Sequence, residues 1–182
     1  MKSFFNIAII CLLAFSIGSC KLPSFSLKPS GKSSKVIPGK SIQVNFFENK
    51  SSLASSSASI QLTESIRDIV LTQSKKELTT EKGEWVIDGV ISDYRITPIS
   101  IQAGTDVAAQ NRLTMTVQFT WEYTGELDES NANMEREGKA TASSFVDYDS
   151  QANFASVEGD LLNELVRQLS QDVYDRVFGG KW

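Results

Sequence analysis

The chain has 182 residues and a net charge of −4 at pH 7, with 18 Lys and Arg against 22 Asp and Glu. It contains no histidine and only two cysteines, which excludes Ser-His-Asp and Cys-His nucleophilic sites and zinc sites built on Cys and His. All 22 acidic residues lie after position 40, together with 12 of the 18 basic ones, so this part lacks the basic footprint of a nucleic-acid-binding protein. We therefore expect no metal, no cofactor and no nucleic-acid partner.

Residues 1–19 have the pattern of a secretory signal peptide, with Lys2 before an apolar run over 4–17 and small residues after it. The run is too short to cross a bilayer, which needs about 20 apolar residues. Cys20 follows Ile-Gly-Ser at 17–19, a sequence that resembles the lipobox of bacterial lipoproteins. That resemblance implies cleavage before Cys20, a diacylglyceryl group on its thiol, and a further acyl chain such as palmitate on its amine. The alternative is a plain secretory signal in which Cys20 is incidental.

Residues 20–40 are rich in serine, proline, glycine and lysine and show neither a helical nor a strand period. We expect a flexible, lipidated tether that lets the following domain stand off from a membrane. The segment carries five lysines and no acidic residue: Lys21, Lys28, Lys32, Lys35 and Lys40. These charges either attract the tether to anionic lipid headgroups or solvate a flexible spacer.

Residues 41–182 are expected to form a single domain that is large enough to bury a hydrophobic core. Alternation of apolar and polar residues predicts strands, and apolar residues at three- and four-residue steps predict helices. Serines before the first helix and Ser156 before the second are candidate N-caps, and the glycines at 179 and 180 end the second helix. In chain order we expect a strand over 41–47, a helix over 59–77, strands over 84–96, 111–124 and 135–146, and a helix over 156–178.

The strand over 84–96 is partly apolar on both faces, which predicts a central strand. Trp85 and Ile87 alternate with residues on the opposite face, to which the alternation also assigns Tyr94. Pro98 is expected to end this strand. The segment 97–110 that follows is long for a hairpin, and long loops are often functional.

The strand over 111–124 has the strongest pattern. Six large apolar side chains from Leu113 to Tyr123 occupy one face, while Thr, Gln, Arg and Glu occupy the other. A shift of register by one residue would move the whole apolar set into water, so the register is well specified. On the next strand the small residues Gly138, Ala140 and Ala142 would let a helix lie close to the sheet.

The element order β-α-β-β-β-α predicts an α+β sandwich, in which a four-stranded sheet carries both helices on one face. The helices bury the apolar sides of the strands, and the other face of the sheet stays bare. A polar, solvated face is normal for an antiparallel sheet, although such a face can also dock a partner.

Several short segments together resemble a known family. They are the lipobox and residues 41–47 (SIQVNFF), 96–99 (ITPI), 109–117 (AQNRLTMTV), 147–150 (DYDS) and 156–158 (SVE). Their types and linear order resemble the LptE-like lipopolysaccharide-assembly outer-membrane lipoproteins, over essentially the whole mature chain from Cys20 to Trp182. The resemblance implies two helices on a four-stranded sheet, which agrees with the periodicity.

The resemblance also implies a non-catalytic role. Members of the family are lipid-anchored on the periplasmic side of the cell outer membrane and sit inside the LptD β-barrel. There they plug the pore, assist assembly of the barrel and aid lipopolysaccharide insertion. The implied partners are an LptD-type barrel, lipopolysaccharide and, through the lipid anchor, the membrane. Lys21 stands where inner-membrane lipoproteins carry an aspartate, so sorting to the outer membrane is implied.

The family is further described as binding lipopolysaccharide through basic residues. Arg or Lys on a rigid strand can bind its phosphates by charge-assisted hydrogen bonds. The candidates are Arg112 on the polar side of its strand, Arg136 and Lys139 on opposite faces of the next strand, and Arg95 at the end of the strand over 84–96. The alternative for each is a solvated residue or a cross-strand pair.

Two other classes of function stay open. One is a periplasmic or surface lipoprotein that binds a soluble ligand in an apolar pocket lined by residues 97–110. The other is an enzyme that uses Asp147 and Asp149 near Asp160, because two carboxylates can hydrolyse a glycoside. The structural alternative to catalysis is a turn in which Asp and Ser side chains bond to the backbone.

Overall fold

The computed structural model describes residues 37–99, 110–129 and 131–179. The predicted signal peptide, Cys20, most of the predicted tether, the middle of the 97–110 segment and Trp182 lie outside the described residues. In chain order the elements are β1 (Ser41–Val44), β2 (Glu48–Asn49), α2 (Ser56–Ser74), β3 (Glu77–Thr79), β4 (Trp85–Ile99), β5 (Gln110–Tyr123), β6 (Glu137–Asp149) and α3 (Phe154–Phe178).

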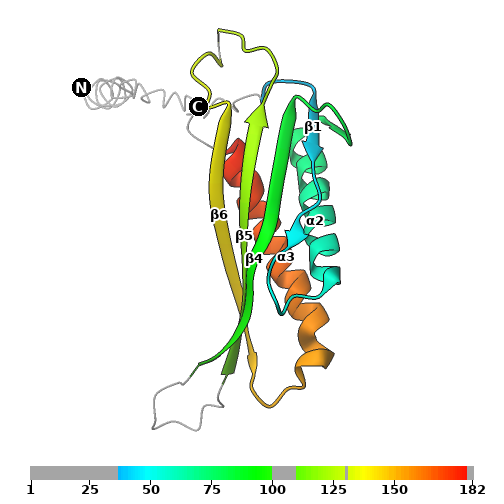
Figure 1. Cartoon of the computed structure of the whole chain (residues 1–182), viewed down its shortest axis with the longest axis vertical. Coiled ribbons are helices and arrows are strands. Elements are labelled where there is room, and N and C mark those ends of the chain that lie inside the picture. Colours follow the sequence, from blue (N-terminus) through cyan, green and yellow to red (C-terminus); the bar gives the residue numbers. More distant parts are fainter. Residues whose placement is uncertain (1–36, 100–109, 130, 180–182) are drawn as a thin grey trace, which may run out of the picture. The chain divides into compact units, whose positions relative to one another are not determined.

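The strands form one six-stranded sheet in the order β3-β1-β4-β5-β6, and β2 also pairs with β4. β1 is parallel to β3 and β4, and β2 is parallel to β4, whereas β4, β5 and β6 form an antiparallel meander. Both helices lie on one face of the sheet (Figure 1). The predicted α+β architecture is therefore confirmed, although the sheet has six strands instead of the predicted four.

The two extra strands are short pieces that alternation does not reveal. The predicted strand over 41–47 is split, because β1 ends at Val44 and β2 covers only Glu48–Asn49. β3 has three residues and follows directly after α2, partly within the predicted helix over 59–77. Alternation becomes recognisable over about 4 to 8 residues, so strands of two or three residues escape it.

The break between β1 and β2 turns Phe47 into the core. Phe47 is fully buried, and its backbone N–H donates to Thr63 Oγ1 at 3.0 Å. Its ring packs on Gly89 of β4, where a Cβ atom would lie 2.2 Å from Cε1 of the ring. Gly89 therefore allows the close approach of Phe47, while Phe46 next to it remains 51% exposed.

A bulge in β4 reverses the alternation of the residues that follow it. The register with β5 shifts between Ile91 and Asp93. Tyr94 is therefore buried on the same helix-covered face as Trp85 and Ile87. The sequence-based placement of Tyr94 on the opposite face is wrong, because the inserted residue shifts the period-2 pattern by one.

β4 also runs past Pro98, which was predicted to end it, and continues to Ile99. Pro98 faces Asn111 of β5. Beyond Ile91, the other edge of β4 pairs with no strand among the described residues. At such an edge the missing N–H of a proline leaves the ladder intact.

Helix α2 begins three residues before the predicted start and ends three before the predicted end. Ser55 occupies the N-cap position in an extended backbone conformation, but its side chain makes no capping hydrogen bond, so the predicted serine cap is not formed there. Lys75 ends the helix in a left-handed conformation with φ of 57°. The serine-rich first turn carries little apolar periodicity, which hides the true start. The helix–sheet contact is made by Leu62, Ile66 and Val70, all at most 1% exposed.

Helix α3 begins at Phe154, just before the predicted start. Its N-cap is Asn153, whose side chain accepts from the N–H of Ala155 at 3.1 Å, so the prediction of Ser156 as N-cap is wrong. At the other end the N–H of Gly179 donates to the carbonyl oxygen of Asp175 at 2.8 Å. The predicted termination at the glycine pair is confirmed at Gly179.

The core lies between the helices and the sheet. Its fully buried members include Leu62, Ile66, Ile87, Ile91, Leu113, Met115, Val117, Leu165 and Val173. Ala142 of β6 is also fully buried there, as expected for a small residue below a helix. Gly138 has a different reason to be small, because a Cβ atom would lie 2.1 Å from Cζ2 of Trp121. It makes room for the indole of a neighbouring strand.

The chain enters the sheet through hydrogen bonds at residues 38–41. Trp85 Nε1 and Lys76 Nζ donate to the carbonyl oxygens of residues 38 and 39 at 2.9 and 2.7 Å. The carboxylate of Glu84 accepts from the N–H groups of residues 40 and 41. Gly39 adopts φ of +81°, which favours glycine. The start of β1 is thus fixed to β4 and to the end of α2.

Candidate binding face

The sheet face that the helices leave uncovered, here called the outer face, is mostly polar. It consists of alternate residues of the three long strands. They are Val86, Asp88, Val90, Asp93, Arg95 and Thr97 of β4, Arg112, Thr114, Thr116, Gln118, Thr120 and Glu122 of β5, and Glu137, Lys139, Thr141, Ser143, Phe145 and Asp147 of β6. Polar residues on one face and apolar residues on the other are expected for an antiparallel sheet with one packed face.

Arg112 of β5 is held by two residues of β6. Its Nε and Nη2 donate to the two carboxylate oxygens of Asp147 at 2.7 and 2.8 Å. Its Cζ lies 3.7 Å from the centre of the Phe145 ring. These hydrogen bonds lower the pKa of the Asp147 carboxyl and raise the pKa of Arg112, because each stabilises the charged form of its partner. Arg112 therefore forms the cross-strand pair that the sequence left open as an alternative.

Arg95 lies on the same face near Arg112. It faces Thr114, which is two residues from Arg112 along β5. Its Nη1 is paired with the carboxylate of Asp93 on its own strand. Phe145, which faces Thr114 from the other side, is 50% exposed. The two arginines, their two partner carboxylates and Phe145 are called the arginine end of the outer face.

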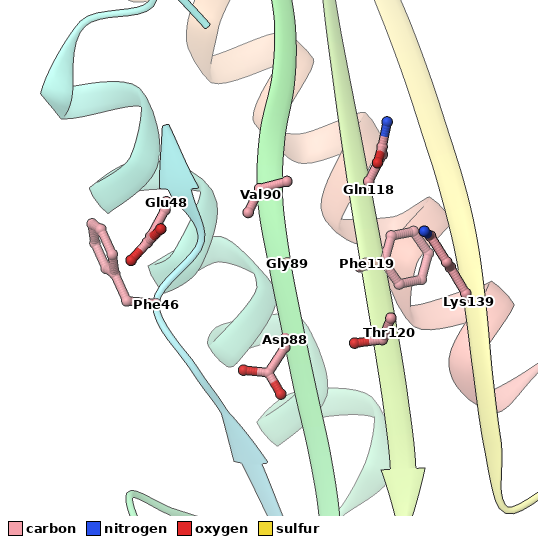
Figure 2. Close-up of a pocket in the computed structure, with 9 residues that line it drawn as sticks. All are labelled: Phe46, Glu48, Asp88, Gly89, Val90, Gln118, Phe119, Thr120 and Lys139. Atoms are coloured by element: carbon pink, nitrogen blue, oxygen red, sulfur yellow. The ribbon is translucent and has the colours of Figure 1, made fainter. Parts of the chain in front are cut away.

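Lys139 lies further along the outer face, in acidic surroundings. It faces Thr120 of β5, which in turn faces Asp88 of β4. Together with Phe46 and Glu48 at the side of the sheet, these residues line a groove of about 350 Å³. Figure 2 shows them around the groove, with the helices on the far side of the sheet. Lys139 forms no hydrogen bond or ion pair with the residues that the structure describes.

A neighbouring groove of about 450 Å³ adds two more carboxylates, Glu122 and Glu137. The residues that line the two grooves include one cationic side chain, Lys139, and four carboxylates: Glu48, Asp88, Glu122 and Glu137. We call this region the acidic end of the outer face. Its negative charge favours a cationic partner over a phosphate.

Arg136 is separate from the other candidates. It precedes the first residue of β6 and so lies in the β5–β6 hairpin, one residue outside the strand. Its Nη1 donates to the carbonyl oxygen of Gly125 at 3.2 Å, and its own carbonyl accepts from Tyr123. The structure thus brings Arg95 and Arg112 together, places Lys139 elsewhere, and uses Arg136 to brace a turn.

The sequence model of one family, described as LptE: Lipopolysaccharide-assembly, matches residues 39–177. The chain belongs to the LptE family. The match begins at the glycine that fixes the chain to the sheet and extends to the last turn of α3, so it spans every strand of the described fold. LptE membership supports a role in lipopolysaccharide assembly.

The chain is similar to several solved structures. Rare lipoprotein B from Shewanella oneidensis has a TM-score of 0.51 at 16% identity, covering 77% of this chain and 95% of that chain. The hypothetical protein CT253 from Chlamydia trachomatis has a TM-score of 0.49 at 11% identity, covering 78% and 97%. A minor lipoprotein from Acinetobacter baumannii has a TM-score of 0.47 at 11% identity, covering 78% and 94%. A comparison with curated protein sequences finds no match.

LptE proteins are a non-enzymatic lipopolysaccharide-assembly family. The carboxylates considered for catalysis have other contacts here. Asp147 binds Arg112, and Asp149 Oδ1 accepts from the N–H of Gln151 at 2.8 Å in the turn before α3. Asp160 lies exposed on α3. Only Asp149 matches the structural alternative of a side chain that bonds to the backbone of the turn, since Asp147 pairs with Arg112 inside β6.

Within residues 37–99, 110–129 and 131–179, no helix is long and apolar enough to cross a membrane. In the same residues, no three acidic side chains are grouped so that they could hold a metal ion.

Two exposed aromatic side chains of this surface, Phe46 and Phe145, were not predicted from the sequence. Phe145 could have been found, because it occupies a polar-face position of a strand whose inward positions are small. Phe46 could not, because its orientation depends on the break between β1 and β2.

Proposed function

We propose that this LptE-family chain is a non-catalytic, lipid-anchored subunit of the outer-membrane lipopolysaccharide translocon, on the periplasmic side. In this role it plugs an LptD-type β-barrel, assists the assembly of that barrel and aids lipopolysaccharide insertion. The observation that carries the proposal is the family match over residues 39–177.

The proposed anchor is Cys20 at the end of the lipobox-like sequence, preceded by a signal peptide over 1–19. A single acyl chain binds a membrane only marginally, at about 0.8 kcal/mol per buried CH₂, so stable anchoring takes more than one chain. Acylation of both the thiol and the amine of Cys20 meets this requirement. The 20–40 tether then links the anchor to the domain.

The outer face suits the interior of a barrel. Strands of membrane barrels direct polar side chains into the lumen. β5 offers a row of such groups, among them Thr116, Gln118 and Thr120, and the hydroxyl oxygens of Thr116 and Ser143 lie 3.0 Å apart. Because the helices cover the other face, the domain can present this polar surface without exposing its core.

We propose the arginine end as the lipopolysaccharide contact. The guanidinium of Arg112 already donates two parallel hydrogen bonds to Asp147, and a phosphate can accept the same fork. Arg95 lies close enough on the same face to bind a second phosphate oxygen, and Phe145 offers an exposed ring to an acyl chain. Lys139 is a weaker candidate because four carboxylates surround its grooves.

Affinity purification from detergent-solubilised envelopes tests the barrel role. The tagged chain is expected to bring down a large outer-membrane β-barrel, and depletion of the chain is expected to lower surface lipopolysaccharide. Cys20→Ser is the matched control for anchoring, since it should abolish incorporation of labelled fatty acid without changing the fold. A chain that carries no barrel, in cells with normal surface glycolipid after depletion, would reject the role and favour a lipoprotein that binds a soluble ligand.

Binding of purified lipopolysaccharide by variants tests the proposed contact. Arg95→Ala combined with Arg112→Ala is expected to weaken binding about tenfold or more and to reduce its salt dependence. Lys139→Ala is the matched control on the same face and should bind as the unsubstituted chain does. Equal losses in the two variants would show that the contact is not at the arginine end.

A further inference from the structure

The two edges of the sheet are protected very differently. At one edge lies β3, which has three residues and offers little to a partner strand. At the other lies β6, with 13 residues and a β5 partner on one side only among the described residues. Unpaired N–H and C=O groups along an edge strand are a template for pairing with another chain, and short edges are one common protection.

The hydrogen-bond pattern shows which groups of β6 point away from β5. The N–H of Tyr123 donates to the carbonyl of Arg136, which fixes the phase of the antiparallel ladder. Because directions alternate along a strand, the odd-numbered residues from 137 to 149 direct their backbone groups outward. We call this row the free edge of β6. The carbonyl of Asp149 already accepts from Ala152, so the row is fully available as far as Asp147.

β6 lacks several of the devices that block an edge. It contains no proline, and its register with β5 runs without a bulge from Glu137 to Asp149. Its inward positions carry no charge and are mostly small. Its outward charges stand only near the two ends of the strand, and the middle is neutral: Glu137 and Lys139 at one end, Thr141 to Val146 between, and Asp147 and Asp149 at the other.

We propose that the free edge of β6 pairs antiparallel with the free edge of a second copy of this chain, so that Ser144 faces Ser144 across a two-fold axis. In this register Lys139 of each copy lies opposite Asp149 of the other, which gives two ion pairs. On the helix side, Ala140 lies opposite Tyr148, and Ala142 lies opposite Val146. Small residues therefore meet large ones at every facing position beside the axis.

Neighbouring registers fit less well. A shift by two residues in one direction places Glu137 opposite Asp149, and like charges directly opposite each other destabilise a strand pair. The same shift places Lys139 opposite Asp147, whose carboxylate Arg112 already binds. A shift by two in the other direction places Lys139 opposite Gln151 and loses both ion pairs. The charge of Lys139 is unused among the described residues, and the register centred on Ser144 pairs it with Asp149 of a second copy without setting like charges opposite each other.

The expected complex is weak. A single pair of edge strands buries less than the roughly 1,200 Å² of a standard interface, which places it among transient contacts. It does not depend on lipopolysaccharide or on a barrel, so its failure would leave the proposed function untouched. The dimer would extend the sheet from one copy into the next and cover the longer of its two edges.

Disulfide trapping in the full-length chain in detergent tests the register. Ser144→Cys places two thiols at a non-hydrogen-bonded pair, where the Cα atoms are about 4.5 Å apart, a distance that a disulfide can span. Thr141→Cys is the matched control on the same strand, since its two copies would lie six residues apart, about 20 Å. We expect a covalent dimer from the first variant only, with the unsubstituted chain reporting any bridge through Cys11 or Cys20. Equal trapping of both variants, or of neither, would overturn the proposal.

A charge swap measured by analytical ultracentrifugation tests the occupant. Lys139→Glu and Asp149→Lys are each expected to weaken self-association about five- to tenfold, because each sets like charges opposite each other twice. The double variant reverses both ion pairs and should restore the association to within about twofold. A chain that stays monomeric at all concentrations, or a double variant no better than the singles, would overturn the proposal.

Discussion

The two faces of β5 show how differently one strand can be constrained. On the helix side, Leu113, Met115 and Val117 are fully buried and Phe119 is 2% exposed. On the outer side, the intervening Thr, Gln and Arg residues meet solvent or the neighbouring strands. Close packing makes the inner face sensitive to the loss or gain of single carbon atoms. The outer face depends on pairing between neighbours, so its residues can change with little effect on folding.

The largest expected effect contrasts adjacent residues of β5. Phe119→Ala should lower the free energy of unfolding by about 3 to 5 kcal/mol, because it removes a buried ring and leaves a cavity. Thr120→Ala, one residue further on the outer face, should change it by no more than about 0.5 kcal/mol. Urea unfolding followed by tryptophan fluorescence measures both. Similar losses in the two variants would contradict the assignment of the faces.

A second contrast concerns glycines. Gly89→Ala should destabilise the fold by about 1 to 3 kcal/mol, because the new Cβ would lie 2.2 Å from the Phe47 ring. Gly159 in α3 has no atom within 4 Å of an added Cβ. Gly159→Ala should therefore stabilise by about 0.5 to 1 kcal/mol, through helix propensity. Opposite signs in thermal unfolding support the packing at Gly89, and a neutral Gly89 variant would argue against it.

Tyr94 on the inner face should make the free energy of unfolding fall as the pH rises above about 10. Burial, with Glu158 nearby, raises the pKa of Tyr94, whose hydroxyl donates to that carboxylate at 3.4 Å. Below about pH 10 the phenol is neutral in both the folded and the unfolded chain, so this contribution is fully present. As pH rises further, the unfolded chain ionises first and stability is lost. The slope of unfolding free energy against pH above 10 should be less steep in Tyr94→Phe than in the unsubstituted chain.

Some alkaline sensitivity should remain in Tyr94→Phe, because burial also raises the pKa values of Tyr123 and Tyr174. Identical alkaline slopes for Tyr94→Phe and the unsubstituted chain would show that Tyr94 is not held in the core.

The smallest effect is expected on the outer face at Arg112 and Asp147. Both are solvent-exposed enough that their ion pair contributes little to folding. A double-mutant cycle with Arg112→Ala and Asp147→Ala should give a coupling energy well below the losses above. Since the pKa of Asp147 is lowered, whatever coupling exists should be present at neutral pH and fade as acid protonates the carboxylate. A coupling energy as large as the loss of unfolding free energy in Phe119→Ala would contradict this expectation, because it would make the ion pair as important for stability as a buried aromatic side chain.

The sequence predicted those parts of the fold that are set by long, regular patterns. The alternation from Leu113 to Tyr123 predicted β5 and its buried face, and the apolar stripe of α3 predicted a helix that ends at Gly179. It missed β2 and β3, which are too short to show a period. It also misplaced Tyr94, because one inserted residue at the bulge reverses the phase and nothing local marks the insertion.

For the candidate site, the sequence predicted the face on which a single residue lies, but not the contacts between residues. Strand parity predicted that Arg112 lies on the outer face, but its contact with Asp147 depends on the register between β5 and β6, which no segment specifies alone. The acidic surroundings of Lys139 likewise come from three strands and the β1–β2 break. Arg136 was predicted on the strand but lies one residue before β6, because the geometry of a hairpin sets a strand end more than its composition does.

The bonded entry at residues 38–41 has a mechanical consequence. β1 runs parallel to both of its neighbours and begins where the chain enters. A load applied through residue 37 along the strand direction would therefore shear β1 between β3 and β4. In shear all the interstrand hydrogen bonds of β1 bear the load at once, whereas in peeling they would break one after another. A force applied at the N-terminal end of the described domain is therefore opposed by all of these hydrogen bonds together.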